Sequence, residues 1–242
     1  TGTSGGRLGL YRFENSTISY PIRPNQGIQK EITISPDGEL LAYISRDHSG
    51  NDELWIYDTE TEDAIQLTFD GGAKWMVTWS PDGEHLAYMH NGANTFDIWQ
   101  VPAFGGPSRR LTDHSGHDAV PLWSVSEPGT LYYASHRRNW ELFVFTPSNP
   151  EQYVFAPSRS LWWPFYMNNE HDIFFVDRTE TLADLAKFNT KSEKSQRLTD
   201  TGDVNFPVMS PDGTKVAFQK AIWAGWELGE LHIRNIEELL KP

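Results

Sequence analysis

The chain of 242 residues contains no cysteine, which excludes disulfides, thiolate metal sites and a cysteine nucleophile. It also has no apolar run near the roughly 18 residues that a membrane-spanning helix needs, so we expect no direct membrane insertion. Basic residues are few, with 20 Lys and Arg against 33 Asp and Glu, and the net charge is -13. A field of this sign repels phosphate, so we expect no nucleic-acid partner.

Several enzyme motifs are missing as well. The sequence has no H-E-x-x-H zinc motif, no G-x-x-x-x-G-K-[ST] phosphate loop, and no G-x-G-x-x-G that opens a helix. It shows no long stretch of helical period, and it offers no segment for the α/β-hydrolase domain of an oligopeptidase. We therefore expect no cofactor, and we favour a protein without catalytic activity.

What the sequence does contain is a repeat. The tetrapeptide Ser-Pro-Asp-Gly begins at Ser35, Ser80 and Ser210, and the first two copies are 45 residues apart. The remaining gap predicts two degenerate copies, which we place at Ser124 and Met167. Pro fixes φ and Gly accepts a positive φ, so this tetrapeptide predicts a tight turn between two strands.

Other columns keep the same period. An acid followed by an aliphatic residue recurs at Glu53-Leu54, Asp97-Ile98, Glu141-Leu142, Asp184-Leu185 and Glu227-Leu228. A Leu-Thr pair closes three of the copies and marks their fourth strand. Because these acids and the turn serines recur from copy to copy, we interpret them as structural residues that bond the backbone, rather than as catalytic groups.

Each copy predicts four short strands, and a forty-odd-residue period of four strands is typical of a β-propeller. We therefore expect an all-β fold with one propeller domain over residues 1–242, with five blades by repeat count and six as the alternative. The blades are expected to start near residues 31, 76, 119, 162 and 205. Strand-like segments in the first 22 residues are predicted to close the last blade.

The turns, the Leu-Ala-Tyr triplets that follow them and the Leu-Thr pairs resemble the PD-type repeats of TolB-like propellers. This resemblance implies a periplasmic or extracytoplasmic bacterial protein, since TolB is a periplasmic adaptor between proteins, with six blades. Similar repeats also resemble the propellers of oligogalacturonate lyases, prolyl-oligopeptidase-type peptidases and the sensor halves of some membrane-anchored regulators. Fold resemblance alone does not choose among these functions.

In a propeller the predicted turns all lie on one face. The loops between the second and third strands, and those between blades, share the opposite face. On that opposite face we single out His114, His117 and Asp118 as binding candidates. A metal site is the alternative reading of the two histidines, but no third histidine is near, and we expect no metal.

The same face is predicted to carry two basic and two aromatic candidates. Arg137 and Arg138 form a basic pair that suits a carboxylate or phosphate, or an acid of the protein itself. Trp223 has no counterpart in the other copies, and Trp163 stands with Trp162 at the mouth of a first strand. Trp223 offers an aromatic platform for a ligand, and the wide side chain of Trp163 would narrow or plug the central channel.

These features favour a non-catalytic propeller that binds a protein, a peptide or a small polar ligand on this loop face, or that acts as a sensor. The alternatives are a carbohydrate-active enzyme of the oligogalacturonate-lyase type, or the propeller of a peptidase separated from its catalytic domain.

Overall fold

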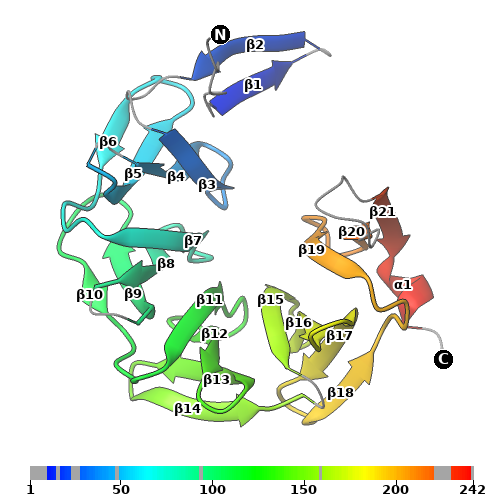
Figure 1. Cartoon of the computed structure of the whole chain (residues 1–242). Helices are drawn as coiled ribbons and strands as arrows, with labels where there is room; N and C mark the ends of the chain where they lie inside the picture. The colour runs from blue at the N-terminus through cyan, green and yellow to red at the C-terminus, as the bar shows by residue number, and fades with distance from the viewer. Residues whose placement is uncertain are drawn as a thin grey trace, which may run out of the picture. The chain divides into compact units, whose positions relative to one another are not determined.

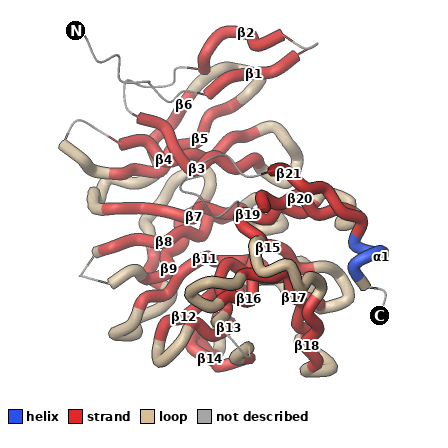
Figure 2. Tube along the Cα trace, turned by 45° about the vertical axis from the view of Figure 1, so that its right-hand side comes forward, coloured by secondary structure: helices blue, strands red, loops and turns tan. Residues whose placement is uncertain are grey.

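The computed structural model describes residues 10–14, 17–22, 28–46, 49–92, 95–157, 160–220 and 230–240. Almost all of these residues lie in antiparallel strands and the turns that join them (Figures 1 and 2). Five sheets follow one another along the sequence and are the blades of a five-bladed β-propeller, as the repeat count predicts. The chain divides into two compact units, Thr1–Asp113 and His114–Pro242, here called unit one and unit two.

Unit one holds a hairpin and two four-stranded blades. The hairpin consists of β1 (Leu10–Glu14) and β2 (Thr17–Ile22), which pair with each other. Closure of the last blade by these strands stays a prediction. Blade one comprises β3 (Ile28–Ile34), β4 (Leu40–Arg46), β5 (Asp52–Asp58) and β6 (Ala64–Gln66). Blade two comprises β7 (Ala73–Trp79), β8 (His85–Asn91), β9 (Asp97–Pro102) and β10 (Arg109–Arg110).

Unit two holds blades three to five. Blade three comprises β11 (His117–Trp123), β12 (Leu131–His136), β13 (Trp140–Thr146) and β14 (Asn149–Phe155). Blade four comprises β15 (Leu161–Met167), β16 (Asp172–Arg178), β17 (Ala183–Asn189) and β18 (Lys194–Arg197). Within the described residues, blade five comprises β19 (Val204–Met209), β20 (Lys215–Lys220) and β21 (Glu230–Asn235), followed by the short helix α1 (Ile236–Leu239).

The Ser-Pro-Asp-Gly tetrapeptides form the predicted turns. In the first, Ser35 Oγ accepts the N–H of Leu40 at 2.9 Å, and the Asp37 carboxylate accepts the N–H of Glu39 at 3.1 Å. The turns at Ser80 and Ser210 repeat these contacts. Hydrogen bonds from the Ser210 hydroxyl and the Thr214 N–H lower the pKa of Asp212 to about 2. The turn serines are therefore structural, as predicted.

The degenerate turn of blade four begins one residue later than the sequence predicted. Met167 pairs with Ile173 and is the last residue of its strand. Asn168 takes the place of the turn serine, because its side-chain oxygen accepts the N–H groups of Glu170 and Asp172 at 3.0 and 2.9 Å. An asparagine can bond the backbone in this way, which is why the turn survives without its usual sequence.

Two of the recurrent acids, Glu53 and Asp184, bond the backbone as their repetition predicted. Glu53 accepts the Thr68 hydroxyl at 2.6 Å and the N–H of Gly71 at 2.7 Å, while the N–H of Leu54 donates to Thr68 Oγ1 at 2.9 Å. Asp184 accepts the Thr199 hydroxyl and the N–H of Gly202 in the same manner. The Leu-Thr pair therefore follows the fourth strand and ties it to the third, rather than lying within the strand.

The acid-aliphatic column was wrongly placed in blade five. Glu227-Leu228 lies outside the described residues, and β21 pairs Leu231 with Gln219 and Glu230 with Lys220. In blade one the corresponding pairs join Leu54 to Ile44 and Glu53 to Ser45. The equivalent pair in blade five is thus Glu230-Leu231, because the preceding loop is three residues longer than the period predicted.

Each unit has its core between successive blades. In unit one, Leu54 and Ile56 of β5 pack against Trp79 and Leu86 of blade two. In unit two, Leu142 of β13 belongs to a cluster with blade-four residues, and a further cluster joins blades four and five. Burying one such aliphatic side chain contributes about 1.5–3 kcal/mol. Within each unit the junctions between blades are therefore layers of side chains, and the candidate site lies at one of them.

Candidate functional site

The first strand of every blade contains a β-bulge. One residue in each has a left-handed backbone, which is uncommon for a residue other than glycine. These residues are Glu31 (φ 53°), Met76 (φ 55°), Val120 (φ 51°), Trp163 (φ 62°) and Phe206 (φ 47°). The pairing with the second strand shifts register around each of them. The five bulge residues occupy one repeat column, yet they differ in size and chemistry.

Strand β15 departs from the other first strands in the size of its irregularity. It contains two more residues than the part of β16 that it pairs with, whereas each other first strand contains one more than its partner. Its pairs with β16 run Trp162 to Val176, Pro164 to Phe175 and Tyr166 to Phe174, so that Trp163 and Phe165 are both skipped. In β7 one register shift, between Trp75 and Thr78, accounts for all of the irregularity. Bulges re-aim side chains and are frequent beside functional sites. Blade four is therefore where the repeat is most distorted.

A pocket of about 100 Å³ opens beside this distortion, between blades four and five. It is lined by Trp162, Trp163, Val176, Arg178, Val204, Asn205, Phe206 and Pro207. The rings of the bulge residues Trp163 and Phe206 meet edge to face, with centroids 5.9 Å apart. The guanidinium of Arg178 lies 5.1 Å from the ring centroid of Trp162. The site thus combines aromatic faces with one cationic group.

The aromatic surface continues into blade three. Trp140 contacts Trp162 edge to face at 6.0 Å, and His136 lies 5.2 Å from Trp140. Such contacts are each worth about 0.5–1.5 kcal/mol beyond the area they bury. They help to hold Trp162 in place.

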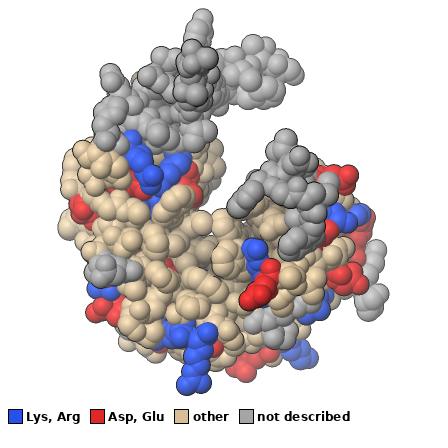
Figure 3. Space-filling model, viewed as in Figure 1, with Lys and Arg blue, Asp and Glu red and all other residues tan. Residues whose placement is uncertain are grey.

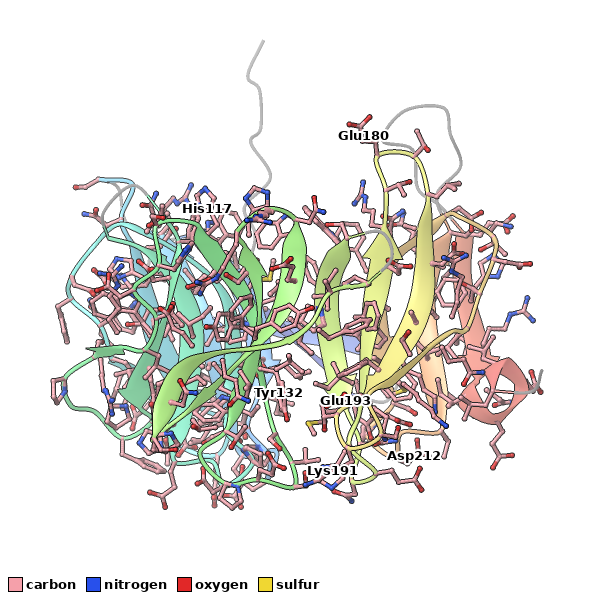
Figure 4. The ribbon with its side chains drawn as sticks, turned by 90° about the horizontal axis from the view of Figure 1, so that it is seen from below. His117, Tyr132, Glu180, Lys191, Glu193 and Asp212 are labelled. Carbon is pink, nitrogen blue, oxygen red and sulfur yellow. The ribbon has the colours of Figure 1, made fainter. Side chains whose placement is uncertain are left out.

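The pocket belongs to the predicted loop face. In Figure 4 the labelled His117 and Glu180 lie at one edge of unit two, and Lys191, Glu193 and Asp212 lie at the opposite edge. Arg178 ends β16 two residues before Glu180, so it belongs to the edge of Glu180. Asp212 marks a turn between first and second strands, which confirms that these turns and the loops near the pocket lie on opposite faces of unit two.

The histidine candidates occupy local positions. His114 Nδ1 accepts the N–H of Gly116 at 2.9 Å, which fixes a short turn before β11. His117 is exposed and pairs across the ladder with His136. Asp118 is buried and accepts the Ser135 hydroxyl at 2.6 Å. No group of three or more His, Cys, Asp or Glu side chains in the described ranges is arranged to hold a metal ion.

The two basic candidates differ from each other. Arg137 donates to Ser135 Oγ at 3.2 Å and to Glu151 at 3.1 Å, and its guanidinium lies 4.2 Å from the Phe143 ring centroid. This arginine pairs with an acid of the protein itself, which was the alternative reading. Arg138 is exposed. On the face drawn in Figure 3 the described basic and acidic side chains are interspersed, so single groups rather than a broad charged field would attract a ligand there.

Of the predicted residues, Trp163 is the one that the structure places in the pocket, while Trp223 lies outside the described residues. Trp162 was predicted only as the neighbour of Trp163, and Arg178 and Phe206 were not among the predicted site residues. A signal for Phe206 was present, because it precedes Pro207 as Trp163 precedes Pro164. No sequence signal distinguished Arg178 from the other arginines, since its role depends on which strands meet.

A second cluster of charged groups lies at the junction of blades one and two. Lys74 is fully buried, and its Nζ lies 2.8 Å from Asp70 and 3.3 Å from Glu53. The ammonium also donates to the backbone oxygen of Asp52 at 2.9 Å. His90 bonds the carbonyl of Gly71 at 3.0 Å. Burial, followed by the positive charge of Lys74, lowers the pKa of His90.

Comparison with known proteins gives the family of the fold. The PD40 family, described as the TolB beta propeller domain, matches residues 35–228. No curated protein sequence matches the chain. Among the described residues, no helix has the length and apolar character required to cross a membrane.

Solved structures with different functions share the fold. TolB from Acinetobacter baumannii is 16% identical with a TM-score of 0.72, over 90% of this chain and 54% of that one. An oligogalacturonate lyase in complex with manganese is 14% identical with a TM-score of 0.71, over 97% and 73%. A puromycin-hydrolyzing peptidase of Mycobacterium tuberculosis is 15% identical with a TM-score of 0.67, over 91% and 39%. The chain thus spans about half the length of the first of these, and the likeness concerns the fold alone.

Proposed function

Because this chain belongs to the TolB β-propeller family, we propose that it is a non-catalytic binding module with its ligand site in the pocket between blades four and five. The observation that carries the proposal is the doubly bulged strand β15, which breaks the repeat where Trp163 reaches the pocket. A left-handed residue recurs in the first strand of every blade, so the feature particular to blade four is the second register shift, between Pro164 and Tyr166. Bulges re-aim side chains and are frequent beside functional sites.

The lining of the pocket supports binding rather than catalysis. Its described residues are aromatic, aliphatic, one asparagine and one arginine. General acid–base and nucleophilic catalysis use His, Asp, Glu, Lys, Tyr, Cys or Ser, positioned at the reacting atoms. The lining instead fits the usual composition of ligand pockets, which are apolar and aromatic with a few polar groups that fix orientation.

The proposed partner is a protein, a peptide or a small polar ligand that reaches the pocket from the loop face. An extracytoplasmic location is part of the same proposal and is supported by the family. The enzyme alternative is supported by the fold likeness to the oligogalacturonate lyase, at 14% identity. Since unrelated functions share this fold, the site has to be tested directly.

The test is a selection on the purified, immobilised chain from a random heptapeptide library that includes free and amidated C-termini. Enriched peptides are then titrated by intrinsic tryptophan fluorescence. We expect Trp163→Ala to weaken binding by about 30-fold, as loss of an aromatic anchor typically costs about 2 kcal/mol or more. Phe104→Ala, at an exposed aromatic residue of unit one, is the matched control and should bind like the wild type.

Two results would contradict the proposal. One is a failure to enrich any peptide, or equal loss of binding in Trp163→Ala and Phe104→Ala. The other is chemical change of a ligand, detected by mass spectrometry of recovered peptides and of oligogalacturonate incubated with the chain and Mn²⁺. Melting temperatures of both variants show whether a loss of binding comes from unfolding.

A further inference from the structure

Building on the proposed function, we infer that the pocket between blades four and five binds a carboxylate joined to one small apolar group, with Arg178 as the counter-ion of the carboxylate. The inference depends on the state of Arg178 and on a comparison with the same column of blade one.

Arg178 is a cation that the described protein does not neutralise. Its guanidinium lies over the ring of Trp162 at 5.1 Å from the centroid, at the edge of the pocket. Within the described residues no carboxylate forms an ion pair with it, whereas the adjacent Asp177 pairs with Arg197. A guanidinium held against an aromatic face keeps its N–H edge available for a planar anion, and it loses little freedom on binding.

Blade one shows what this position binds when the chain supplies the anion. Arg46 ends β4 as Arg178 ends β16, so the two arginines share a repeat column. Arg46 pairs across the sheet with Asp52, and two of its nitrogens contact the Asp52 carboxylate at 2.7 and 2.9 Å. The cross-strand partner of Arg178 is Ala183. Blade four has therefore kept the arginine and lost the acid.

The column directly before the bulge residue supports the same comparison. It holds Lys30 in blade one and Trp162 in blade four. Lys30 lies 3.5 Å from the Trp75 ring centroid and contacts the buried carboxylate of Asp52 at 2.8 Å. In blade one Arg46 and Lys30 both contact the carboxylate of Asp52, whereas in blade four Arg178 lies over Trp162 and no described residue provides its anion. An external carboxylate at Arg178 would complete the arrangement that Asp52 completes in blade one.

The rest of the pocket determines what accompanies the carboxylate. Trp163, Phe206, Val176 and Val204 form apolar walls around about 100 Å³, the volume of roughly three water molecules. This space admits one small aliphatic group. Strands β15 and β19 are the first strands of their sheets and each pairs on one side only, so their free edges offer backbone donors and acceptors. The C-terminal residue of a peptide and a small free carboxylic acid share this chemistry.

The test uses four probes: N-acetyl-leucine, N-acetyl-leucinamide, and one heptapeptide ending in leucine as the free acid and as the amide. Binding to the full chain is measured by tryptophan fluorescence. We expect each acid to bind at least about tenfold more tightly than its amide, because the charge-assisted bidentate contact is lost in the amide. Arg178→Gln should abolish this preference, while Arg138→Gln, at an exposed arginine of the same face, should keep it.

A second variant tests the comparison with blade one. Ala183→Asp places a carboxylate opposite Arg178, as Asp52 stands opposite Arg46. It should abolish acid binding while the chain still folds, which the melting temperature checks. Ala183→Asn, of nearly the same shape and without the charge, should reduce acid binding less.

The outcomes distinguish a peptide terminus from a small acid as the source of the carboxylate. They also distinguish failure of this inference from failure of the proposed function. A peptide acid that binds more tightly than N-acetyl-leucine supports a chain terminus, and equal affinities support a small acid. Amides that bind as well as acids, or an acid preference that survives Arg178→Gln, would overturn the inference. If the binding of the selected peptides is still weakened by Trp163→Ala in that case, the proposed binding function stands. If it is not weakened, the proposed binding function is contradicted as well.

Discussion

Two junctions between blades differ in what their equivalent residues do. At the junction of blades one and two these residues form a charged cluster whose charges are paired within the protein, and at the junction of blades four and five they line a pocket. In both, an arginine ends the second strand of the earlier blade, Arg46 or Arg178. The residue directly before the bulge of that blade is Lys30 at the first junction and Trp162 at the second. At the first junction Arg46, Lys30 and Trp75 surround the buried Asp52. At the second, Arg178 and Trp162 face a pocket, and Ala183 stands where the acid would be.

The first strand of the later blade differs as well. Two residues before its bulge residue it holds the buried Lys74 at the first junction and the buried Val204 at the second. Lys74 is surrounded by Asp70, Glu53 and backbone oxygens, so its charge is satisfied within the protein. Charged groups at a repeat position are therefore structural where the blade completes them, and they become candidates for ligand binding where it does not.

The largest expected effect concerns the junction between blades one and two, where the charge of Lys74 is paired within the protein. Lys74→Met removes the ammonium but keeps much of the side-chain volume, and it leaves Glu53 and Asp70 without their buried cation. Breaking a buried ion pair in this way typically costs about 3–5 kcal/mol. The free energy of unfolding, from urea titrations followed by far-UV circular dichroism, should fall by that amount.

The matched control is Lys191→Met. Lys191 is 63% exposed and lies 3.5 Å from Glu127, so this pair should contribute at most about 1 kcal/mol. If both substitutions cost the same, the charged cluster around Lys74 does not stabilise its junction, and the contrast between the two junctions is lost.

A smaller effect on stability is expected from the bulge residue Trp163 at the junction between blades four and five. Trp163→Ala and Trp163→Gly both remove the ring, but only glycine accepts a φ of 62° without cost. The glycine variant should be more stable than the alanine variant by about 1–2 kcal/mol. At the preceding Trp162, whose backbone is not left-handed, the order should reverse, since glycine inside a strand is less stable than alanine by about 0.5–1 kcal/mol.

The same urea titrations measure these four variants. An identical order at the two positions would show that the bulge at Trp163 stores no strain.

The sequence predicted the fold because the turns and paired strands depend on local chemistry. Proline and glycine define the Ser35 turn, and the acid of Glu53 recurs with the threonine it bonds. The prediction was wrong where that chemistry was replaced, as at Asn168, or where a loop changed length, as before Glu230. In both places the blade still forms, but the residues that occupy the repeat positions are shifted along the chain relative to the prediction.

The candidate site was harder to predict because it depends on neighbours across the sheet. Trp163 was selected as a wide side chain at the mouth of a first strand, and the structure places it in the pocket. Arg178 was missed because its significance comes from the absence of an acid at Ala183, five residues away along the chain and opposite in the sheet. His114 and Arg137 attracted attention by residue type, but their contacts are local.

The smallest expected effect is a difference in pH dependence between the two junctions. Burial lowers the pKa of His90, and Lys74 lowers it further, while Asp70 opposes the shift. Folded His90 is therefore neutral at a pH where the unfolded histidine, with a pKa near 6.5, takes up a proton. The unfolded state then binds more protons, so stability falls as the pH falls below about 6.5 and toward the lower folded pKa.

His90→Gln should flatten this part of the stability curve, measured as the free energy of unfolding between pH 7.5 and 5.5. Parallel curves for the variant and the wild type would show that His90 does not titrate differently on folding.

For the pocket that holds Arg178 we expect ligand binding not to depend on pH in this range. Its described lining holds no group that titrates in this range, and the carboxylate of a peptide terminus has a pKa of about 3.3–3.7. Binding of the acid probes should therefore stay constant over the interval in which the stability of the wild type declines.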